Sequence, residues 1–192
     1  MLVIICGLPA AGKTTLARAL ARRTGGVHLR VDTIEQAIVR SGLAAQPLGP
    51  AGYAVAYALA EEHLRQGLTV IAESVNPLAV TRDAWQDVAG RAGVPVLEAE
   101  IVCSDPVEHR RRAEHRTVDI PDLALPTWEA IVGRAYELWD REHLVVDTAG
   151  RDVAACVADL IRGLPSAPAR ANAWRGVPAG PRSGPATRVP RR

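Results

Sequence analysis

Two glycines, a lysine and a threonine near the start of the chain have the types and the spacing of a phosphate-binding loop. Residues 7–14 read GLPAAGKT, which matches the pattern G-x-x-x-x-G-K-T. The glycines allow a backbone path that turns several N–H groups toward one point, where they and a helix N-terminus can hold an anion. In such loops the lysine reaches the β- and γ-phosphates, and the threonine hydroxyl can ligate Mg²⁺. The pattern predicts an ATP site formed by Gly7, Pro9, Ala10, Ala11, Gly12, Lys13, Thr14 and Thr15, with Mg²⁺ at Thr14.

The residues on either side supply the strand and the helix that this loop requires. Residues 1–6 are apolar and rich in β-branched side chains, as expected of a buried parallel strand, and residues 15–23 are rich in good helix formers. Lys13 is also the only lysine in the chain. A chance glycine-rich turn is the alternative, and the complete motif with both flanks argues against it.

Strands alternate with helices along the rest of the chain. Strands are expected at 27–31, 68–72, within 94–103 and at 144–147, and helices are expected after Thr33 and at 53–66, 78–91, 106–116, 127–141 and 152–161. This alternation predicts an α/β fold with a doubly wound, mainly parallel five-stranded sheet and helices on both faces. Ligands of such sheets lie at the carboxyl ends of the strands.

Acidic residues stand at two of these strand ends. Glu73 follows the strand expected beside the loop strand, and an acid there can hold Mg²⁺ directly or through water. A solvated strand end is the structural alternative for Glu73. Asp32 follows the strand at 27–31, where it can cap the next helix.

Charge divides the chain into two regions. The formal net charge is +2, and residues 163–192 hold six arginines and no acid, which leaves about −4 for residues 1–162. We expect one domain over 1–162 and a disordered Pro/Arg-rich tail over 163–192. A solvated extension and a weak binder of acidic surfaces or nucleic acid are both possible functions of such a tail.

The cysteines and the hydropathy indicate a cytoplasmic protein. Cys6, Cys103 and Cys156 are far apart and form neither a disulfide framework nor a zinc motif, so core packing is expected for all three. No run of about 18 apolar residues is present, so no membrane-spanning helix is expected.

The remaining motifs narrow the class of nucleotide-binding protein. The chain lacks the N-K-x-D motif of GTPases, and the strand at 68–72 ends in one acid rather than in the acidic pair of large ATPase motors. The phosphate-binding loop and Asp32 resemble those of the predicted ATP-dependent kinases of the P-loop kinase superfamily. The resemblance extends to segments 70–77 (VIAESVNP), 103–116 (CSDPVEHRRRAEHR), 126–139 (PTWEAIVGRAYELW) and 145–148 (VVDT). Chloramphenicol phosphotransferase, gluconate kinase, the zeta toxins and polynucleotide kinases belong to this superfamily, and the resemblance spans residues 1–162.

The resemblance implies roles for residues outside the loop. Asp32 matches the aspartate that faces the acceptor hydroxyl, and Thr148 lies where relatives contact adenine. Arg112 and Arg116, four residues apart on one expected helix, match the arginines of a lid that closes over the transferred phosphoryl group, with a short lid at 117–126. A salt-bridged surface helix is the alternative for these arginines.

The sequence therefore predicts a phosphotransferase that uses ATP and Mg²⁺ to phosphorylate a hydroxyl of a small molecule. The acceptor pocket is expected to be formed by residues 41–53, the helix after them and the segment near Trp128. A polynucleotide 5′-hydroxyl kinase and a non-catalytic, nucleotide-dependent switch are the alternatives. The mildly acidic domain argues against nucleic acid as the partner, and no membrane partner is expected.

Overall fold

A parallel sheet lies at the centre of the computed structural model, which describes residues 1–165. In this part of the chain the sheet contains β1 (Leu2–Cys6), β2 (Val27–Arg30), β3 (Val70–Glu73), β4 (Val96–Val102) and β5 (Leu144–Asp147). The strand order is β2-β3-β1-β4-β5, and every neighbouring pair is parallel. Ile5 is paired with Glu73 across β1 and β3, so the phosphate-binding loop and Glu73 leave the sheet at the same edge.

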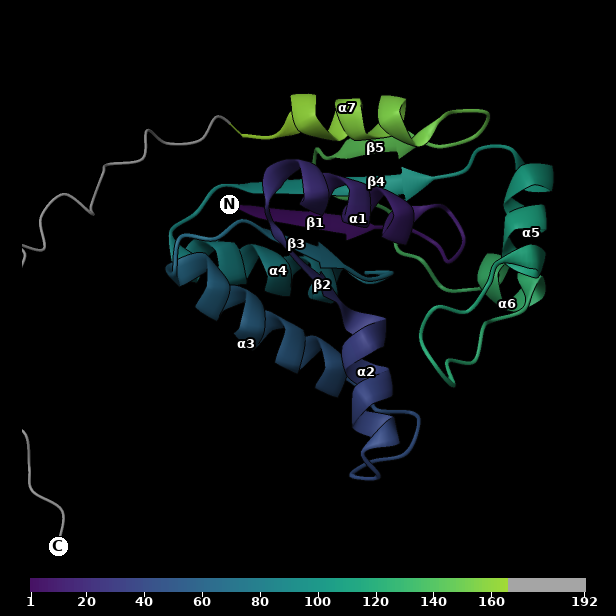
Figure 1. The fold of residues 1–192 in the computed structure, drawn as a ribbon, viewed down its shortest axis with the longest axis horizontal. Coiled ribbons are helices and arrows are strands. Elements are labelled where there is room, and N and C mark those ends of the chain that lie inside the picture. Colours follow the sequence, from purple (N-terminus) through teal and green to yellow (C-terminus); the bar gives the residue numbers. More distant parts are fainter. Residues whose placement is uncertain (166–192) are drawn as a thin grey trace, which may run out of the picture.

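Helices cover both faces of this sheet. The described helices are α1 (Lys13–Thr24), α2 (Val31–Arg40), α3 (Ala51–Arg65), α4 (Ala79–Ala92), α5 (Pro106–His115), α6 (Trp128–Val132) and α7 (Val153–Gly163). Figure 1 shows α1 and α7 on one face and α3 and α4 on the other, with α5 and α6 beyond the carboxyl ends of the strands. The doubly wound, five-stranded fold is thus confirmed, and the sheet is entirely parallel.

Strand β1 contributes to two hydrophobic cores. Val3 and Ile5 pack with residues of α1 and α7, whereas Leu2 and Ile4 pack with residues of α3 and α4. Successive side chains of a strand point to opposite faces, so a strand that serves two cores must be apolar throughout. All five residues of β1 are buried. The three cysteines are also buried and free, which confirms their packing role.

Two local predictions are wrong. The helix α2 begins at Val31 with Arg30 as its N-cap, so Asp32 lies in the first turn and does not cap the helix. The helix predicted for 127–141 ends at Val132. The other strands and helices lie within a few residues of their predicted positions.

The buried Arg82 explains why residues 133–143 are not helical. Arg82 is fully buried, and its Nη1 and Nη2 donate to the carbonyl oxygens of Glu137 at 3.1 Å and Leu138 at 3.2 Å. Its guanidinium carbon lies 4.4 Å from the ring centroid of Trp139. The Glu137 N–H donates to the Pro77 carbonyl oxygen at 2.8 Å. These contacts hold this irregular segment against α4, and tertiary packing overrides the local helix preference.

The described part of the chain ends at residue 165. The tail predicted to start at residue 163 lies outside the described residues from residue 166 onward, and Gly163 itself is the last residue of α7. No helix in the described part of the chain is long and apolar enough to cross a membrane.

We predict that Arg82→Met lowers the free energy of unfolding by about 2–4 kcal/mol, because two carbonyl oxygens lose their charged donor and Trp139 loses its cation–π contact. Urea denaturation followed by Trp fluorescence measures this loss. Arg22→Met, on an exposed position of α1, is the matched control and should change stability by less than about 0.5 kcal/mol. Equal stability of the two variants would contradict this account of segment 133–143.

Candidate functional site

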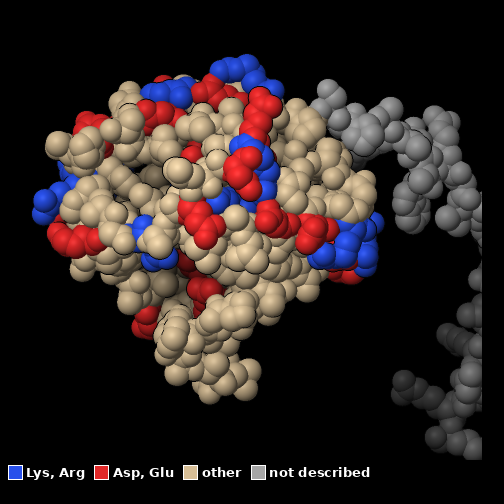
Figure 2. Space-filling model, turned by 180° about the vertical axis from the view of Figure 1, so that it is seen from behind, with Lys and Arg blue, Asp and Glu red and all other residues tan. Residues whose placement is uncertain are grey.

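A cleft of about 1250 Å³ opens at the carboxyl edge of the sheet. Its walls come from the phosphate-binding loop, α2, the start of α3, the end of β3 and the segment 117–126. In Figure 2 this hollow lies beside the projection that contains the uncharged loop 41–50, and acidic side chains are visible within it. The cleft brings the predicted nucleotide site and Asp32 into one cavity.

The phosphate-binding loop has the backbone that its glycines predict. Gly7 has a φ of 126° and Gly12 a φ of 105°, both in the region that favours glycine. A Cβ at Gly7 would overlap the Ile101 carbonyl oxygen on β4. Gly12 is the N-cap of α1, where no side chain caps the helix and no acid occupies the first turn. The first N–H groups of α1 are therefore left for an anion.

Lys13 lies at the end of this loop, and its ammonium group is buried. It is 8% exposed, and its Nζ donates to the Leu8 carbonyl oxygen at 2.8 Å. Burial lowers the pKa of Lys13 to about 8, although the negative charges of Glu73 and Asp32 oppose this shift. A phosphate at the loop would supply the negative charge that a buried ammonium requires.

Thr14 and Glu73 form a direct contact that suits a hard cation. The Thr14 hydroxyl donates to Glu73 Oε1 at 2.5 Å, and Glu73 Oε2 lies 2.8 Å from His28 Nε2. Burial of Glu73 opposes its ionisation, but the hydrogen bonds from His28 and Thr14 and the charges of Lys13 and Arg30 outweigh it and lower the pKa. A hydroxyl oxygen and a carboxylate oxygen beside a phosphate site are suitable ligands for Mg²⁺. The residues present therefore fit the ion.

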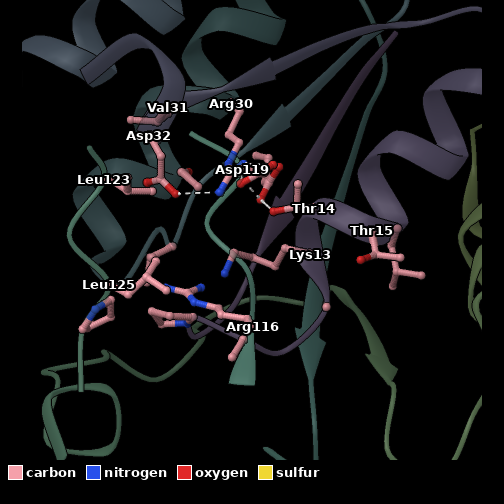
Figure 3. A pocket seen from close by; sticks show the side chains of 18 of the residues that line it. Lys13, Thr14, Thr15, Arg30, Val31, Asp32, Arg116, Asp119, Leu123 and Leu125 are labelled. Carbon is pink, nitrogen blue, oxygen red and sulfur yellow. Dashed lines mark hydrogen bonds and ion pairs between the residues drawn. The ribbon is translucent and has the colours of Figure 1, made fainter. Parts of the chain in front are cut away.

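Asp32 reaches the same cleft from the first turn of α2. Its side chain is 45% exposed, and Oδ2 lies 3.5 Å from Arg30 Nη2. Arg30 Nη1 also donates to both carboxylate oxygens of Asp119, at 3.0 and 2.9 Å, and Arg18 of α1 donates to Asp119 at 2.5 Å. Figure 3 shows Asp32, Arg30 and Asp119 around one side of the cavity.

The structure separates the two predicted lid arginines. Arg116 does not belong to α5; it follows the helix with an extended backbone, so the expectation of one shared helix face is wrong. Figure 3 shows Arg116 and Lys13 pointing toward one another, with Leu125 beside Arg116 and Leu123 beside Asp32. Burial lowers the pKa of Arg116, and its Nε has no hydrogen-bond partner among the described residues.

Arg112 contacts the other side of the loop. It donates to the Thr148 hydroxyl at 2.8 Å, to the Thr148 carbonyl oxygen at 3.0 Å and to Glu108 at 2.6 Å. The Thr148 hydroxyl lies 2.9 Å from the Ala11 carbonyl oxygen and 3.0 Å from that of Val102. Thr148 lines the cleft, but its side chain holds the loop, and its contact with adenine stays a prediction.

Sequence reasoning missed several residues that support the site. His28 orients Glu73, Asp119 joins Arg18 to Arg30, and His109 of α5 lies 2.8 Å from the Pro9 carbonyl oxygen through Nε2. These partners are 45 to 101 residues apart in the chain. Their pairing depends on the strand order and the path of segment 117–126, and no local pattern encodes it.

Comparisons with known proteins agree with this geometry. The loop, the sheet and the cleft define a P-loop nucleotide-binding protein with the fold of the P-loop kinases. A family model described as an AAA domain matches residues 2–135, which is more than half of the chain. The chain therefore belongs to this AAA-domain family. No curated protein matches it.

Solved structures of kinases share the fold. A kinase candidate from Chloroflexus aurantiacus is 24% identical with a TM-score of 0.65, covering 85% of this chain and 98% of that one. A gluconokinase from Sinorhizobium meliloti is 17% identical with a TM-score of 0.57, covering 84% and 89%. The APS kinase CysC of Mycobacterium tuberculosis is 16% identical with a TM-score of 0.54, covering 84% and 95%. At these identities the likeness establishes the fold.

We predict that Thr148→Val destabilises the protein by about 1–3 kcal/mol, because the Ala11 and Val102 carbonyl oxygens and the Arg112 guanidinium lose a buried partner. The nucleotide dissociation constant should rise as well, since the loop loses a tie to β4 and α5. Urea denaturation and titration with ADP measure the two effects. Thr33→Val, on an exposed position of α2, should leave both unchanged; a similar effect of both variants would refute the assigned role of Thr148.

Proposed function

We propose that the protein is an ATP- and Mg²⁺-dependent phosphotransferase that transfers the γ-phosphoryl group to a hydroxyl of a small molecule. The observation that carries this proposal is the position of the Asp32 carboxylate in the same cleft as Lys13 and the phosphate-binding loop. A nucleotide-binding module without an acceptor has no need of a carboxylate opposite its phosphate site. The names of the gluconokinase and APS kinase neighbours agree with a small acceptor.

The loop and Lys13 bind the phosphates. The N–H groups of the loop and of the first turn of α1 face the phosphate oxygens, and Lys13 moves from the Leu8 carbonyl oxygen to the β- and γ-phosphates. Pro9, Ala10, Ala11 and Thr15 contribute backbone to this site. Because the ammonium is buried and preorganised, its attraction to the developing charge is stronger than in water.

Thr14 and Glu73 would hold Mg²⁺, with His28 fixing the carboxylate of Glu73. When bound, the ion neutralises charge on the β- and γ-phosphates and orients them. The direct contact between Thr14 and Glu73 places a hydroxyl and a carboxylate oxygen together at the end of the loop. Such second-layer support of a carboxylate is typical of metal sites.

Asp32 orients the acceptor and takes its proton. The carboxylate accepts a hydrogen bond from the acceptor hydroxyl, whose oxygen attacks the γ-phosphorus while the bond from that phosphorus to the β–γ bridging oxygen breaks. The hydroxyl proton passes to Asp32, and ADP carries away the bonding electrons. Arg30 limits the movement of Asp32 through their ion pair at 3.5 Å.

Arg116 stabilises the transferred group, and Arg112 supports the nucleotide side. Arg116 lies next to Lys13, and its unpartnered Nε leaves capacity for an oxygen of the transferred phosphoryl group. Leu123 and Leu125 of segment 117–126 exclude water from this side of the cleft. Arg112 is already bonded to Glu108 and Thr148, which fixes it beside Gly12.

Asp32→Asn should lower kcat by about 10²–10⁴-fold, because the amide cannot take the acceptor proton, and the affinity for ATP should remain. ADP release is measured with Mg·ATP across neutral, cationic and anionic hydroxyl compounds and 5′-hydroxyl oligonucleotides. Asp87→Asn, an exposed position of α4, serves as the control. ATP binding without acceptor-dependent turnover in the wild type would favour a nucleotide-dependent switch, and turnover of oligonucleotides alone would favour a polynucleotide kinase.

Thr14→Ala should raise the Mg²⁺ concentration required for half-maximal activity by about tenfold, because the ion loses a ligand and Glu73 loses a hydrogen bond. Magnesium titrations at saturating ATP measure this shift, and chelation by EDTA should abolish turnover in the wild type. Thr33→Ala should behave as the wild type. An unchanged Mg²⁺ requirement in Thr14→Ala would remove Thr14 from the proposed ion site.

A further inference from the structure

The acceptor side of the cleft contains a second carboxylate on the same helix as Asp32. Glu35 follows Asp32 by three residues on α2, and both side chains line the cleft. Residues three apart on a helix lie on one face, with about 5–6 Å between their Cβ atoms. The two carboxylates therefore face the acceptor side together.

The packing of α3 fixes the side chain of Glu35. Gly52, in the first turn of α3, is buried against it, and a Cβ at Gly52 would overlap the Glu35 side chain. Glu35 is half-buried, and no described residue forms a hydrogen bond or an ion pair with it. Burial and the nearby charge of Asp32 raise the pKa of Glu35, so a cation beside it would relieve an unfavourable charge.

The wall next to Glu35 supplies groups that suit a polar ligand. Tyr53 and Tyr57 of α3 line the cleft, and their ring centroids are 6.0 Å apart. Ser74 is 5% exposed, and its hydroxyl lies near the Tyr53 hydroxyl. Within the described chain the Ser74 hydroxyl has no hydrogen bond of normal geometry. A buried hydroxyl in this state calls for a partner, and Ser74 also lines the cleft.

Several cations of the cleft are already paired with carboxylates. Arg30 and Arg18 bond to Asp119, and Arg112 bonds to Glu108. Lys13 and Arg116 face the phosphate site. Arg134, exposed after α6, and Arg111, exposed on α5, also line the cleft, and both would favour an anionic acceptor. They lie on different segments from Asp32, whereas Glu35 shares its helix face.

We propose that Glu35 binds a protonated amino group of the acceptor, so that the substrate class is a cationic amino alcohol or amino sugar. This inference rests on the proposed phosphotransferase function. The nitrogen lies between Glu35 and the Tyr53 ring, and a hydroxyl a few bonds away reaches Asp32. Carboxylates and aromatic faces are the groups that recognise an ammonium ion.

Matched acceptors at pH 7 test this assignment. Glucosamine is compared with glucose, N-acetylglucosamine and gluconate, and ethanolamine with ethylene glycol, in ADP-release assays and in calorimetric binding with AMPPNP present. We expect each amine to have at least a tenfold higher kcat/KM and a tighter Kd than its neutral partner. Glu35→Gln should raise KM and Kd for the amines by about tenfold, with kcat within a factor of about two, and leave the neutral compounds unchanged.

Two further variants separate this role from a structural one. Glu62→Gln, an exposed carboxylate on α3, should leave the preference for amines unchanged. Arg134→Gln should also leave the preference for amines unchanged. If gluconate proves to be the best acceptor and Arg134→Gln abolishes its turnover, the inference is overturned. A loss of stability in Glu35→Gln without a change in the amine-to-neutral ratio would assign Glu35 to packing against α3 alone and would also overturn it.

The inference and the proposed function fail in different ways. If neutral or anionic acceptors have a kcat/KM equal to or higher than that of the matched amines, the phosphotransferase function is supported and the ammonium site is overturned. ATP binding with no turnover of any acceptor overturns the phosphotransferase. In that case tighter binding of glucosamine than of glucose, lost in Glu35→Gln, would still identify the ammonium site, and equal binding would overturn it.

Discussion

The backbone turn between β1 and α1 is the constraint on which the rest of the site depends. Its N–H groups face outward only because Gly7 and Gly12 adopt positive φ values and because the Ile101 carbonyl oxygen leaves no room for a Cβ at Gly7. An uncapped helix end surrounded by protein is costly unless something else holds it in place. Thr148, His109 and the Lys13 bond to Leu8 do so. Residues from α1, α5 and the position directly after β5 thus hold one loop.

The two halves of the cleft differ in how completely their polar groups are paired. Around the phosphate-binding loop, Thr14 pairs with Glu73, Glu73 with His28 and Arg112 with Glu108, whereas Arg116 Nε has no partner among the described residues. On the proposed acceptor side the Tyr53 and Tyr57 hydroxyls are bonded to backbone, whereas the Glu35 carboxylate has no hydrogen bond or ion pair within the described residues. A carboxylate left in this state discriminates between ligands by their charge.

The sequence predicted the fold and the loop because both follow from local patterns. An apolar strand, the motif G-x-x-x-x-G-K-T and a helix-forming run follow one another directly. Their order alone predicts that Lys13 and Thr14 lie at the start of a helix beside a phosphate site. The sequence could not predict that residues 133–143 would leave the helix, because that depends on Arg82 from another helix. Nor could it place Asp119 between Arg18 and Arg30. Glu35 could have been found, since it follows Asp32 at helical spacing, but only packing by Gly52 distinguishes it from a solvated glutamate.

Asp119 connects the helix that carries Lys13 and Thr14 to the helix that carries Asp32. Its carboxylate forms ion pairs with both Arg18, on the helix that carries Lys13 and Thr14, and Arg30, the residue before α2. Any shift of α1 on nucleotide binding is therefore felt at the helix that carries Asp32, and any shift of α2 on acceptor binding is felt at α1. Linkage makes such a coupling reciprocal: in the proposed reaction, whatever factor ATP applies to the affinity for the acceptor, the acceptor applies to the affinity for ATP. Asp119 would carry this coupling between α1 and α2.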